Sequence, residues 1–320
     1  MAWSFTLDLR SIAPLCASAM SEKRIVVGLG ELLWDIFPNG KLLGGAPANF
    51  AYITNLLGNT GVPASRLGCD PLGGEARERL SQLGLTDEYV QEDPIYPTGT
   101  VKVEVDKYGQ PQFEILHPVA WDFLEWNADW KRLAQQTDAV CFGSLAQRSP
   151  QSRSTIRSFL SATRPQTVRV FDVNLRQNFY SKEIIEHAMD LATIVKLNHE
   201  ELPILMSLLG VEHRNEQESA WHLLSSYELK LICVTRGNEG SLLLCAAQRS
   251  EHPGFQVKVA DTVGAGDAFT AALVHGYLRG DPLDEINQNA NRVGAWVASQ
   301  PGATPSPKLQ GLEHTLAEVG

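Results

Sequence analysis

The stretch TVRVFDVNLRQNFYSKEIIEHAMDLATIVKLN, residues 167–198, joins two kinds of hydrophobic pattern. Its two ends, TVRVFDVN and ATIVKLN, are short apolar runs rich in β-branched residues, which is typical of strands covered on both faces. The segment between them, Ser181 to Leu191, has the length of a helix. A strand, a helix and a second strand in this order predict a parallel pair joined by a right-handed crossover.

The same alternation continues along most of the chain. Other strand-like runs are RIVVGLG, DAVCFGS and LKLICVTRG, and other helix-length segments are Ser149 to Ala162, His199 to Leu209 and Asn215 to Ser226. We therefore expect an α/β fold in which helices cover a parallel sheet. Ligands of such sheets bind beyond the carboxyl ends of the strands, so we expect the functional site at that edge.

One region departs from the alternation. In TGTVKVEVDKYGQPQFEIL, Thr98 to Leu116, valines alternate with charged residues before the turn-like KYGQ. This pattern predicts a hairpin with one apolar and one polar face. Together with WDIFPNGKLLGG, it would form a small sheet that projects from the main body as a lid. The alternative is an ordinary edge hairpin of the main sheet.

Composition narrows the class of protein. The 320 residues are 43% hydrophobic, enough for one large core or for one large and one small domain. The net charge of -10 and the absence of a basic block argue against a nucleic-acid-binding surface. No apolar run approaches the roughly 18 residues of a membrane helix, so we expect no membrane partner.

The cysteines and the first residues bear on the compartment. The five cysteines, at positions 16, 69, 141, 233 and 245, are odd in number and widely spaced. Such spacing fits reduced thiols in the cytoplasm better than a disulfide scaffold or a zinc site. In residues 1–20, Asp8 precedes the only arginine, so a disordered leader or an upstream start site is favoured over a secretory signal.

The segment DTVGAGDAF, Asp261 to Phe269, runs into the helical pattern TAALVHGYL. Its small residues Gly264, Ala265 and Gly266 allow close approach of a ligand to the backbone, and the first N–H groups of the helix form an anion hole. Asp267 falls in the first turn, where an ionised carboxylate beside a phosphate accepts a hydroxyl proton. The alternative is that Asp267 only caps the helix and the glycines only make a turn.

A second glycine cluster lies near the start of the chain, in LLGGAPANFAYITNLLG, Leu42 to Gly58. Gly44 and Gly45 precede a helix pattern with Asn49 in its first turns. Close backbone approach and an amide that both donates and accepts suit the hydroxyls of a sugar. The alternative is a simple loop followed by a helix start.

The two segments GGAPAN and DTVGAGDAF resemble the signatures of the ribokinase-like sugar kinases, also called the PfkB family. GELLWD, DVNLR, KLNHEE and VTRGNEGS match in the same order, so the resemblance covers nearly all of Lys23 to Pro307. The resemblance implies a three-layer α/β/α sandwich with a mostly parallel central sheet and a small β-sheet lid. It also implies a leader (1–22), a kinase domain (23–312) with lid segments near 33–45 and 96–117, and a tail (313–320).

The resemblance also implies roles for particular residues. Asp267 would be the general base, and Gly264, Ala265 and Gly266 would hold the transferring phosphate. Arg176 would lie near the sugar or the phosphate; the alternative is an ion pair with Asp172 or another acid. The residues implied to bind sugar hydroxyls are Asp35, Gly44, Gly45 and Asn49.

For the nucleotide, Asn198 and Glu201 match an N-x-x-E segment that helps to order magnesium-bound water. They also fit a capping box at a helix start, and both roles can coexist. A turn beside the nucleotide is matched by Thr235, Arg236 and Gly237. A monovalent cation site, suited to K⁺ and built mostly from carbonyl oxygens, would involve Asp261, Val263, Val297, Gln300, Gly302 and Ser306.

The strings GE-x-x-x-D, PTGTVKVEVD and GSLAQRSPQSR are most similar to those of fructokinases. We therefore expect an ATP- and Mg²⁺-dependent kinase that phosphorylates the 6-hydroxyl of fructose. The alternatives are a related kinase for 2-keto-3-deoxygluconate, ribose or a nucleoside, and, from another class, a catalytically silent kinase-shaped binding protein. An exposed apolar face on the lid would make a homodimer interface.

Overall fold

The computed structural model describes residues 23–38, 40–105 and 111–306. The expected leader, the KYGQ turn and the expected tail lie outside the described residues. The domain boundaries at residues 23 and 312 therefore stay predictions.

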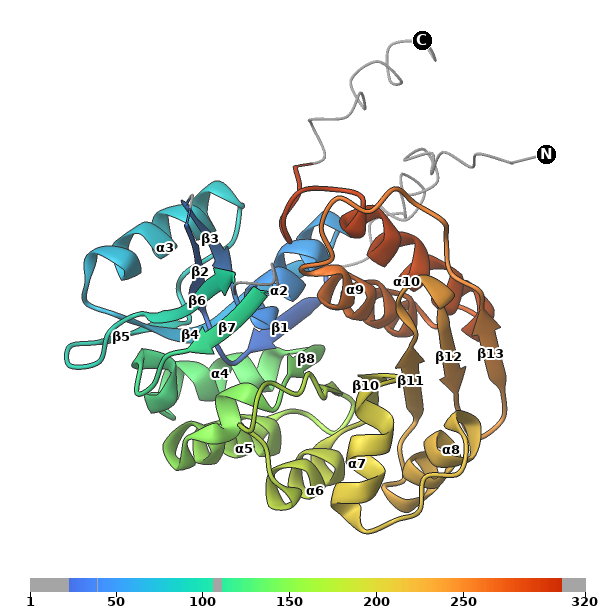
Figure 1. The fold of residues 1–320 in the computed structure, drawn as a ribbon. Coiled ribbons are helices and arrows are strands. Elements are labelled where there is room, and N and C mark those ends of the chain that lie inside the picture. The colour runs from blue at the N-terminus through green and yellow to red at the C-terminus, as the bar shows by residue number, and fades with distance from the viewer. Residues whose placement is uncertain (1–22, 39, 106–110, 307–320) are drawn as a thin grey trace.

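A nine-stranded sheet with the order β13-β12-β11-β10-β9-β8-β1-β4-β5 forms the centre of the molecule (Figure 1). The pairs from β11 to β5 are parallel, and β12 and β13 join antiparallel at one edge. The mostly parallel sheet is thus confirmed. The strands are β1 (Ile25–Leu29), β4 (Thr60–Gly68), β5 (Val90–Asp93), β8 (Ala139–Phe142), β9 (Val168–Asp172), β10 (Ile194–Asn198), β11 (Leu231–Thr235), β12 (Ser241–Leu244) and β13 (Arg249–His252).

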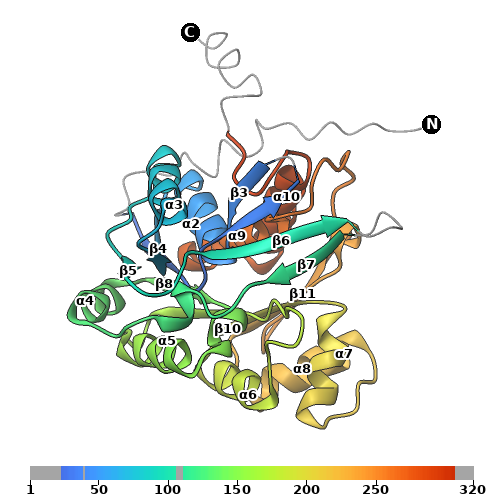
Figure 2. The same ribbon diagram turned by 60° about the vertical axis from the view of Figure 1, so that its left-hand side comes forward.

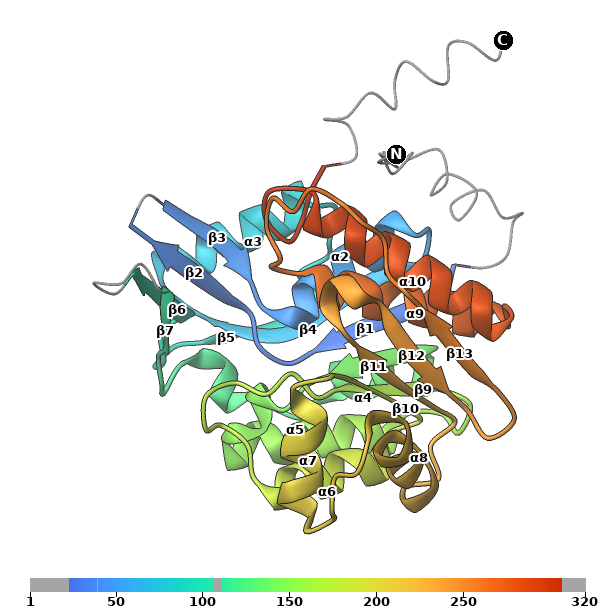
Figure 3. The same cartoon turned by 45° about the vertical axis from the view of Figure 1, so that its right-hand side comes forward.

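Helices cover both faces of this sheet, as Figures 1 and 3 show. One layer consists of α4 (Ala128–Gln136), α5 (Pro150–Ala162), α6 (Lys182–Leu191), α7 (Glu201–Leu209) and α8 (Glu216–Ser226). The other layer consists of α2 (Ala46–Leu56), α3 (Pro71–Gln82), α9 (Ala265–Arg279) and α10 (Leu283–Ala298). Short 3-10 helices are η2 (Ala120–Phe123), η3 (Leu145–Arg148) and η4 (Gly237–Glu239). The three-layer sandwich is confirmed.

The strands divide their side chains between two apolar cores. In β1, Val27 and Leu29 pack with the layer of α4 to α8, whereas Val26 packs with the layer of α2, α9 and α10. Because both faces are buried, the strands are apolar at nearly every position, which explains the runs seen in the sequence. A charged residue within such a strand is therefore an exception, and β10 contains one at Lys196.

A separate four-stranded sheet with the order β3-β2-β6-β7 projects from one end of the molecule (Figures 2 and 3). Its strands are β2 (Leu33–Phe37), β3 (Gly40–Gly44), β6 (Gly99–Val105) and β7 (Pro111–Ile115). The predicted hairpin is the antiparallel pair β6–β7, and β6 runs parallel to β2. The alternative of an edge hairpin in the main sheet is wrong, because β6 pairs with β2 of the small sheet.

Two further expectations concern the described residues only. Cys69, Cys141, Cys233 and Cys245 are free thiols in the structure. None of the helices in the ranges given above combines the length and the apolar character needed to cross a membrane.

Candidate active site

The two glycine-containing segments come together although they lie far apart in the chain. Helix α9 begins after Gly264, whose φ of 77° favours glycine, and Asp267 lies in its first turn. The amide of Asn49, on α2, donates a hydrogen bond of 2.9 Å to Oδ2 of Asp267 across 218 residues of sequence. A helix cap and a simple turn do not require this contact. The contact instead joins the predicted sugar-binding amide to the predicted base.

Gly44 and Gly45 have no Cβ, which lets a side chain approach the first glycine and a backbone carbonyl approach the second. A Cβ on Gly44 would lie 2.4 Å from Oδ2 of Asp35, and a Cβ on Gly45 would lie 2.5 Å from the carbonyl oxygen of Glu31. Gly45 also has a φ of 105°. The pair is therefore more than a loop before a helix, because it seats the Asp35 carboxylate against β3.

Three acids in this region have raised pKa values. Burial raises the pKa of Asp267 to about 6, against the lowering effect of the Asn49 hydrogen bond. Burial also raises the pKa of Asp35 to about 6 and that of Glu31 to about 7. The charge of Arg176 lowers all three pKa values, so the guanidinium acts on the same cluster of carboxyl groups.

Arg176 itself is exposed and follows the carboxyl end of β9. The alternative that it forms an ion pair with Asp172 is wrong, because Asp172 pairs with Lys196 at 3.1 Å. A contact of 3.4 Å joins Nη1 of Arg176 to the carbonyl oxygen of Leu175. The structure therefore leaves the guanidinium at the surface next to the acidic cluster.

Sequence reasoning missed several residues of this region. Glu31 is buried, and its Oε2, like Oδ1 of Asn49, has no hydrogen-bond partner among the described residues. Buried acceptors of this kind need donors, and sugar hydroxyls are donors. Lys196 and Asp172 form a buried ion pair beside α9. The signal for Lys196 was a single charge within the apolar run IVKLN.

At the predicted nucleotide segment, Asn198 and Glu201 make reciprocal bonds. Oδ1 of Asn198 accepts from the N–H of Glu201, and the Glu201 carboxylate accepts from the N–H groups of Asn198 and Leu175, each at 2.8 Å. These are the bonds of a capping box. Because both carboxylate oxygens already accept bonds, the pair fits a magnesium ion through ordered water rather than by direct ligation.

The second nucleotide segment lies at the carboxyl end of β11. Thr235 is the last residue of the strand, and Gly237, with a φ of 59°, begins the turn η4. Nε of Arg236 donates to Glu216 at 2.9 Å, and its Nη1 donates to Glu251 at 2.8 Å. Two carboxylates therefore fix the guanidinium and offset its charge. A hollow of about 430 Å³ is lined by Arg236, Asn238, Glu239, Glu251, His252, Pro253 and Gln256.

The residues expected around a monovalent cation come from the loop before α9, from the end of α10 and from the loop that follows α10. Oδ1 of Asp261 accepts from the N–H of Val263 at 3.0 Å, and Oδ2 accepts from the N–H of Gly302 at 3.2 Å. The N–H of Gln300 donates to the carbonyl oxygen of Val297. Ser306 is exposed. In the described part of the chain no group of three His, Cys, Asp or Glu could hold a metal ion.

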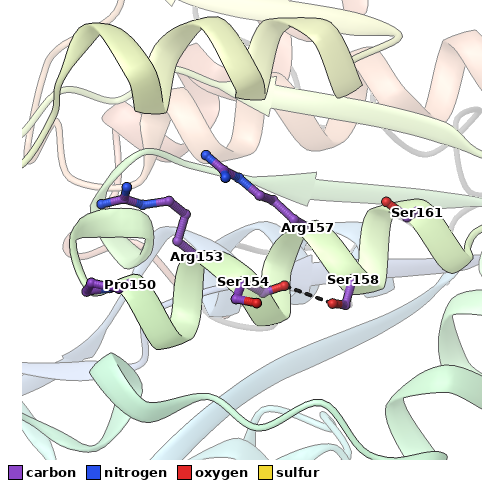
Figure 4. A pocket seen from close by; sticks show the side chains of 6 residues that line it. All are labelled: Pro150, Arg153, Ser154, Arg157, Ser158 and Ser161. Atoms are coloured by element: carbon purple, nitrogen blue, oxygen red, sulfur yellow. Dashed lines mark hydrogen bonds between the residues drawn. The ribbon is translucent and has the colours of Figure 1, made fainter.

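A hollow of about 440 Å³ lies along the outer surface of α5 and is lined by Pro150, Arg153, Ser154, Arg157, Ser158 and Ser161 (Figure 4). The two arginines lie 3.4 and 3.6 Å from Glu183. Helix α5 belongs to the layer opposite α2 and α9. This hollow is therefore separate from the acidic cluster around Asp267.

The sandwich and the convergence of the two glycine segments define the class of ribokinase-like sugar kinases. A model of the pfkB family of carbohydrate kinases matches residues 30–309. The chain belongs to this family and is an ATP-dependent phosphotransferase, as expected from the sequence.

The chain is similar to a fructokinase in sequence and to two solved kinase structures. A fructokinase of Escherichia coli is 32% identical over 311 residues, which cover 89% of this chain and 97% of that protein. The crystal structure of an uncharacterized sugar kinase from Pyrococcus horikoshii in complex with ATP has a TM-score of 0.75 and 29% identity, covering 88% of this chain and 95% of that one. A Vibrio cholerae fructokinase with fructose, ADP and calcium has a TM-score of 0.75 and 26% identity, covering 88% and 94%.

Proposed function

We propose that this kinase is a fructokinase that transfers the γ-phosphoryl group of ATP to the 6-hydroxyl of D-fructose. The observation that carries the proposal is the hydrogen bond between Asn49 and Asp267 at the N-terminus of α9. It joins a hydroxyl-binding amide, a carboxylate base and an anion-binding helix end in one place. The choice of fructose is supported by the relatives named as fructokinases.

In the proposed reaction the carboxylate of Asp267 accepts the proton of the 6-hydroxyl. The hydroxyl oxygen forms a bond to the γ-phosphorus, and the bond from that phosphorus to the β,γ-bridging oxygen breaks, so that ADP leaves with the electron pair. Backbone N–H groups of Gly264, Ala265 and Gly266 bind the transferring group at the helix end. Most of the rate enhancement comes from positioning and charge stabilisation.

Sugar recognition is assigned to the acceptors that surround the base. Asp35, seated against Gly44, and the buried amide of Asn49 bind sugar hydroxyls, while Gly45 lets α2 begin close to the ligand. The exposed guanidinium of Arg176 acts on this cluster of carboxyl groups and neutralises charge that develops on the phosphoryl group. Hydroxyl-binding sites of this kind discriminate strongly among substrates.

The nucleotide is assigned to the adjoining strand ends, with Thr235, Arg236 and Gly237 beside the phosphates and base. A bound Mg²⁺ would supply positive charge that stabilises the phosphates during transfer. Asn198 and Glu201 would order its water ligands. Carbonyl oxygens of the loops that Asp261 joins would bind K⁺ behind the anion hole, together with Val297, Gln300 and Ser306.

The small sheet is assigned the role of a lid and of a homodimer interface. Leu42 on β3 is 49% exposed, which leaves an apolar side chain available to a second lid. Sedimentation at micromolar concentration tests the interface. A monomer there would contradict it.

The experiment that tests the function measures ADP release with Mg-ATP and K⁺ on fructose, glucose, ribose, 2-keto-3-deoxygluconate and adenosine. We expect turnover on fructose that collapses in Asp267→Asn. Turnover on another acceptor alone would refute the choice of fructose but retain the base. Full activity of the variant would refute the role of Asp267.

A further inference from the structure

A buried ion pair lies beneath the first turn of α9. Lys196 of β10 and Asp172 of β9 face each other in register on adjacent parallel strands. The ammonium nitrogen lies 3.1 and 3.2 Å from the two oxygens of Asp172, and the residues are 7% and 5% exposed. Buried pairs of this kind stabilise proteins little, because the loss of hydration offsets the attraction. The pair therefore calls for a role other than stability.

The pair is connected to the anion hole. The hydroxyl of Thr270, on α9, lies 2.9 Å from Oδ2 of Asp172 and also 2.9 Å from the carbonyl oxygen of Gly266. The ammonium of Lys196 lies 3.2 Å from the position that a Cβ on Gly266 would take. The lysine thus reaches the same turn that contains the base.

Lys196 is positively charged beside the first turn of α9. Burial lowers its pKa, but the carboxylates of Asp172, Glu201 and Asp267 outweigh burial and raise the pKa above its usual range. An ammonium has three N–H groups, and the two contacts with Asp172 use at most two of them. The remaining N–H is left for a group bound at the N-terminal turn of α9, where the anion hole is proposed.

We propose that Lys196 is a further catalytic residue, whose ammonium donates a hydrogen bond to the transferring phosphoryl group while Asp172 holds it against Gly266. This inference rests on the proposed kinase reaction. The lysine keeps its proton throughout, and the hydroxyl proton goes to Asp267. Asp172 is a positioning residue, since it acts through the lysine and through Thr270.

The test compares Lys196→Gln with the double variant Lys196→Gln and Asp172→Asn. The single variant leaves a buried carboxylate without its partner, so it can lose activity through misfolding. The double variant removes both charges and avoids that effect. Lys230→Gln is the matched control, because Lys230 is exposed just before the neighbouring strand β11.

We expect both Lys196 variants to lower kcat by about 100-fold, as the loss of one preorganised donor does, with little change in the KM for the sugar. Recovery of activity in the double variant would overturn the proposal, because a purely structural pair tolerates replacement by two neutral amides. Unchanged kcat in a folded Lys196→Gln would overturn it as well. Circular dichroism and thermal unfolding establish that each variant is folded.

A binding experiment separates this inference from the identity of the sugar. The parent and the folded double variant are titrated with Mg-ADP alone and with Mg-ADP plus aluminium fluoride, a mimic of the transferring phosphoryl group. We expect aluminium fluoride to tighten binding to the parent, and we expect the double variant to lose about 100-fold of that gain while its affinity for ADP alone stays within threefold. An equal gain in both proteins would overturn the role of Lys196, whichever sugar is the substrate.

Discussion

Replacing Asp267 by asparagine should stabilise the protein while it lowers kcat by about 100-fold or more. Burial raises the pKa of this carboxyl from an ordinary 3.8 to about 6. Keeping the carboxylate charged in the folded protein therefore lowers the free energy of unfolding. A difference of about 2 pKa units corresponds to about 3 kcal/mol, and the partial exposure of the side chain reduces this to about 1–3 kcal/mol. The Asn side chain keeps an oxygen that can accept the hydrogen bond from Asn49.

The sign of the pH dependence follows from linkage. Because the folded pKa is the higher one, the contribution of Asp267 to stability is fully present below pH 3.8 and is lost as the pH rises through 6. The advantage of the variant should therefore be largest near pH 8. It should fall to about half near pH 5.

The assay is urea denaturation of the parent and Asp267→Asn at both pH values, with kcat measured on the same preparations. We expect kcat to fall by about 100-fold or more, as removal of a general base does. Asp284→Asn is the control, because Asp284 also lies in the first turn of a helix but is exposed. Its loss should destabilise α10 by about 0.3–1 kcal/mol through the helix dipole. A variant no more stable than the parent at pH 8, or a gain that does not depend on pH, would refute the reasoning.

Three further outcomes are expected. In a pH series from 5 to 8, kcat/KM for the sugar should fall about tenfold per pH unit below pH 6, because Asp267 must be ionised to act as base; a flat profile would contradict this. Gly44→Ala should raise the KM for the sugar about tenfold or more, because the new Cβ would lie 2.4 Å from the Asp35 carboxylate. Gly74→Ala is the control and should leave this KM unchanged, because its Cβ would meet no atom within 4 Å. Initial-rate kinetics with each substrate distinguish the two variants. Arg236→Gln should lower the free energy of unfolding by about 1–2 kcal/mol in urea denaturation, since it removes charge-assisted bonds to Glu216 and Glu251; unchanged stability would show that the pairs are too solvent-screened to matter.

Local sequence patterns predicted much of the main fold. The strands β9 and β10 and the helix α6 between them follow from alternating apolar runs, since strands buried on two faces leave a clear signal. The pairing of β6 with β2 was harder, because it depends on a crossover that the hairpin pattern does not encode. Even so, the strand content of the small sheet was recognisable from its alternation of valine with charged residues.

The site was predictable where it depends on backbone shape and less so where it depends on pairing. The turn at Gly264 and the place of Asp267 in the first turn of α9 were predictable, because a helix start leaves a local pattern in the sequence. The partner of Asp172 depends on the register of two strands, and the partners of Arg236 come from α8 and β13. The spacing of residues within one segment predicts neither the partner of Asp172 nor the partners of Arg236. The carbonyl donors proposed near Asp261 stay a prediction, because backbone ligands leave almost no trace in side-chain identity.

The contact between Asn49 and Asp267 has a consequence for how the chain is made. All nine strands of the main sheet are synthesised before residue 253, whereas α9 and α10, which cover one face with α2, follow it. Tyr52 on α2 donates a 2.7 Å hydrogen bond to the carbonyl oxygen of Pro305, near the end of the described chain. A nascent chain that lacks α9 and α10 therefore exposes an apolar face and lacks Asp267, the proposed base. Synthesis must therefore pass the end of α10 before the protein can bury its second core or turn over substrate.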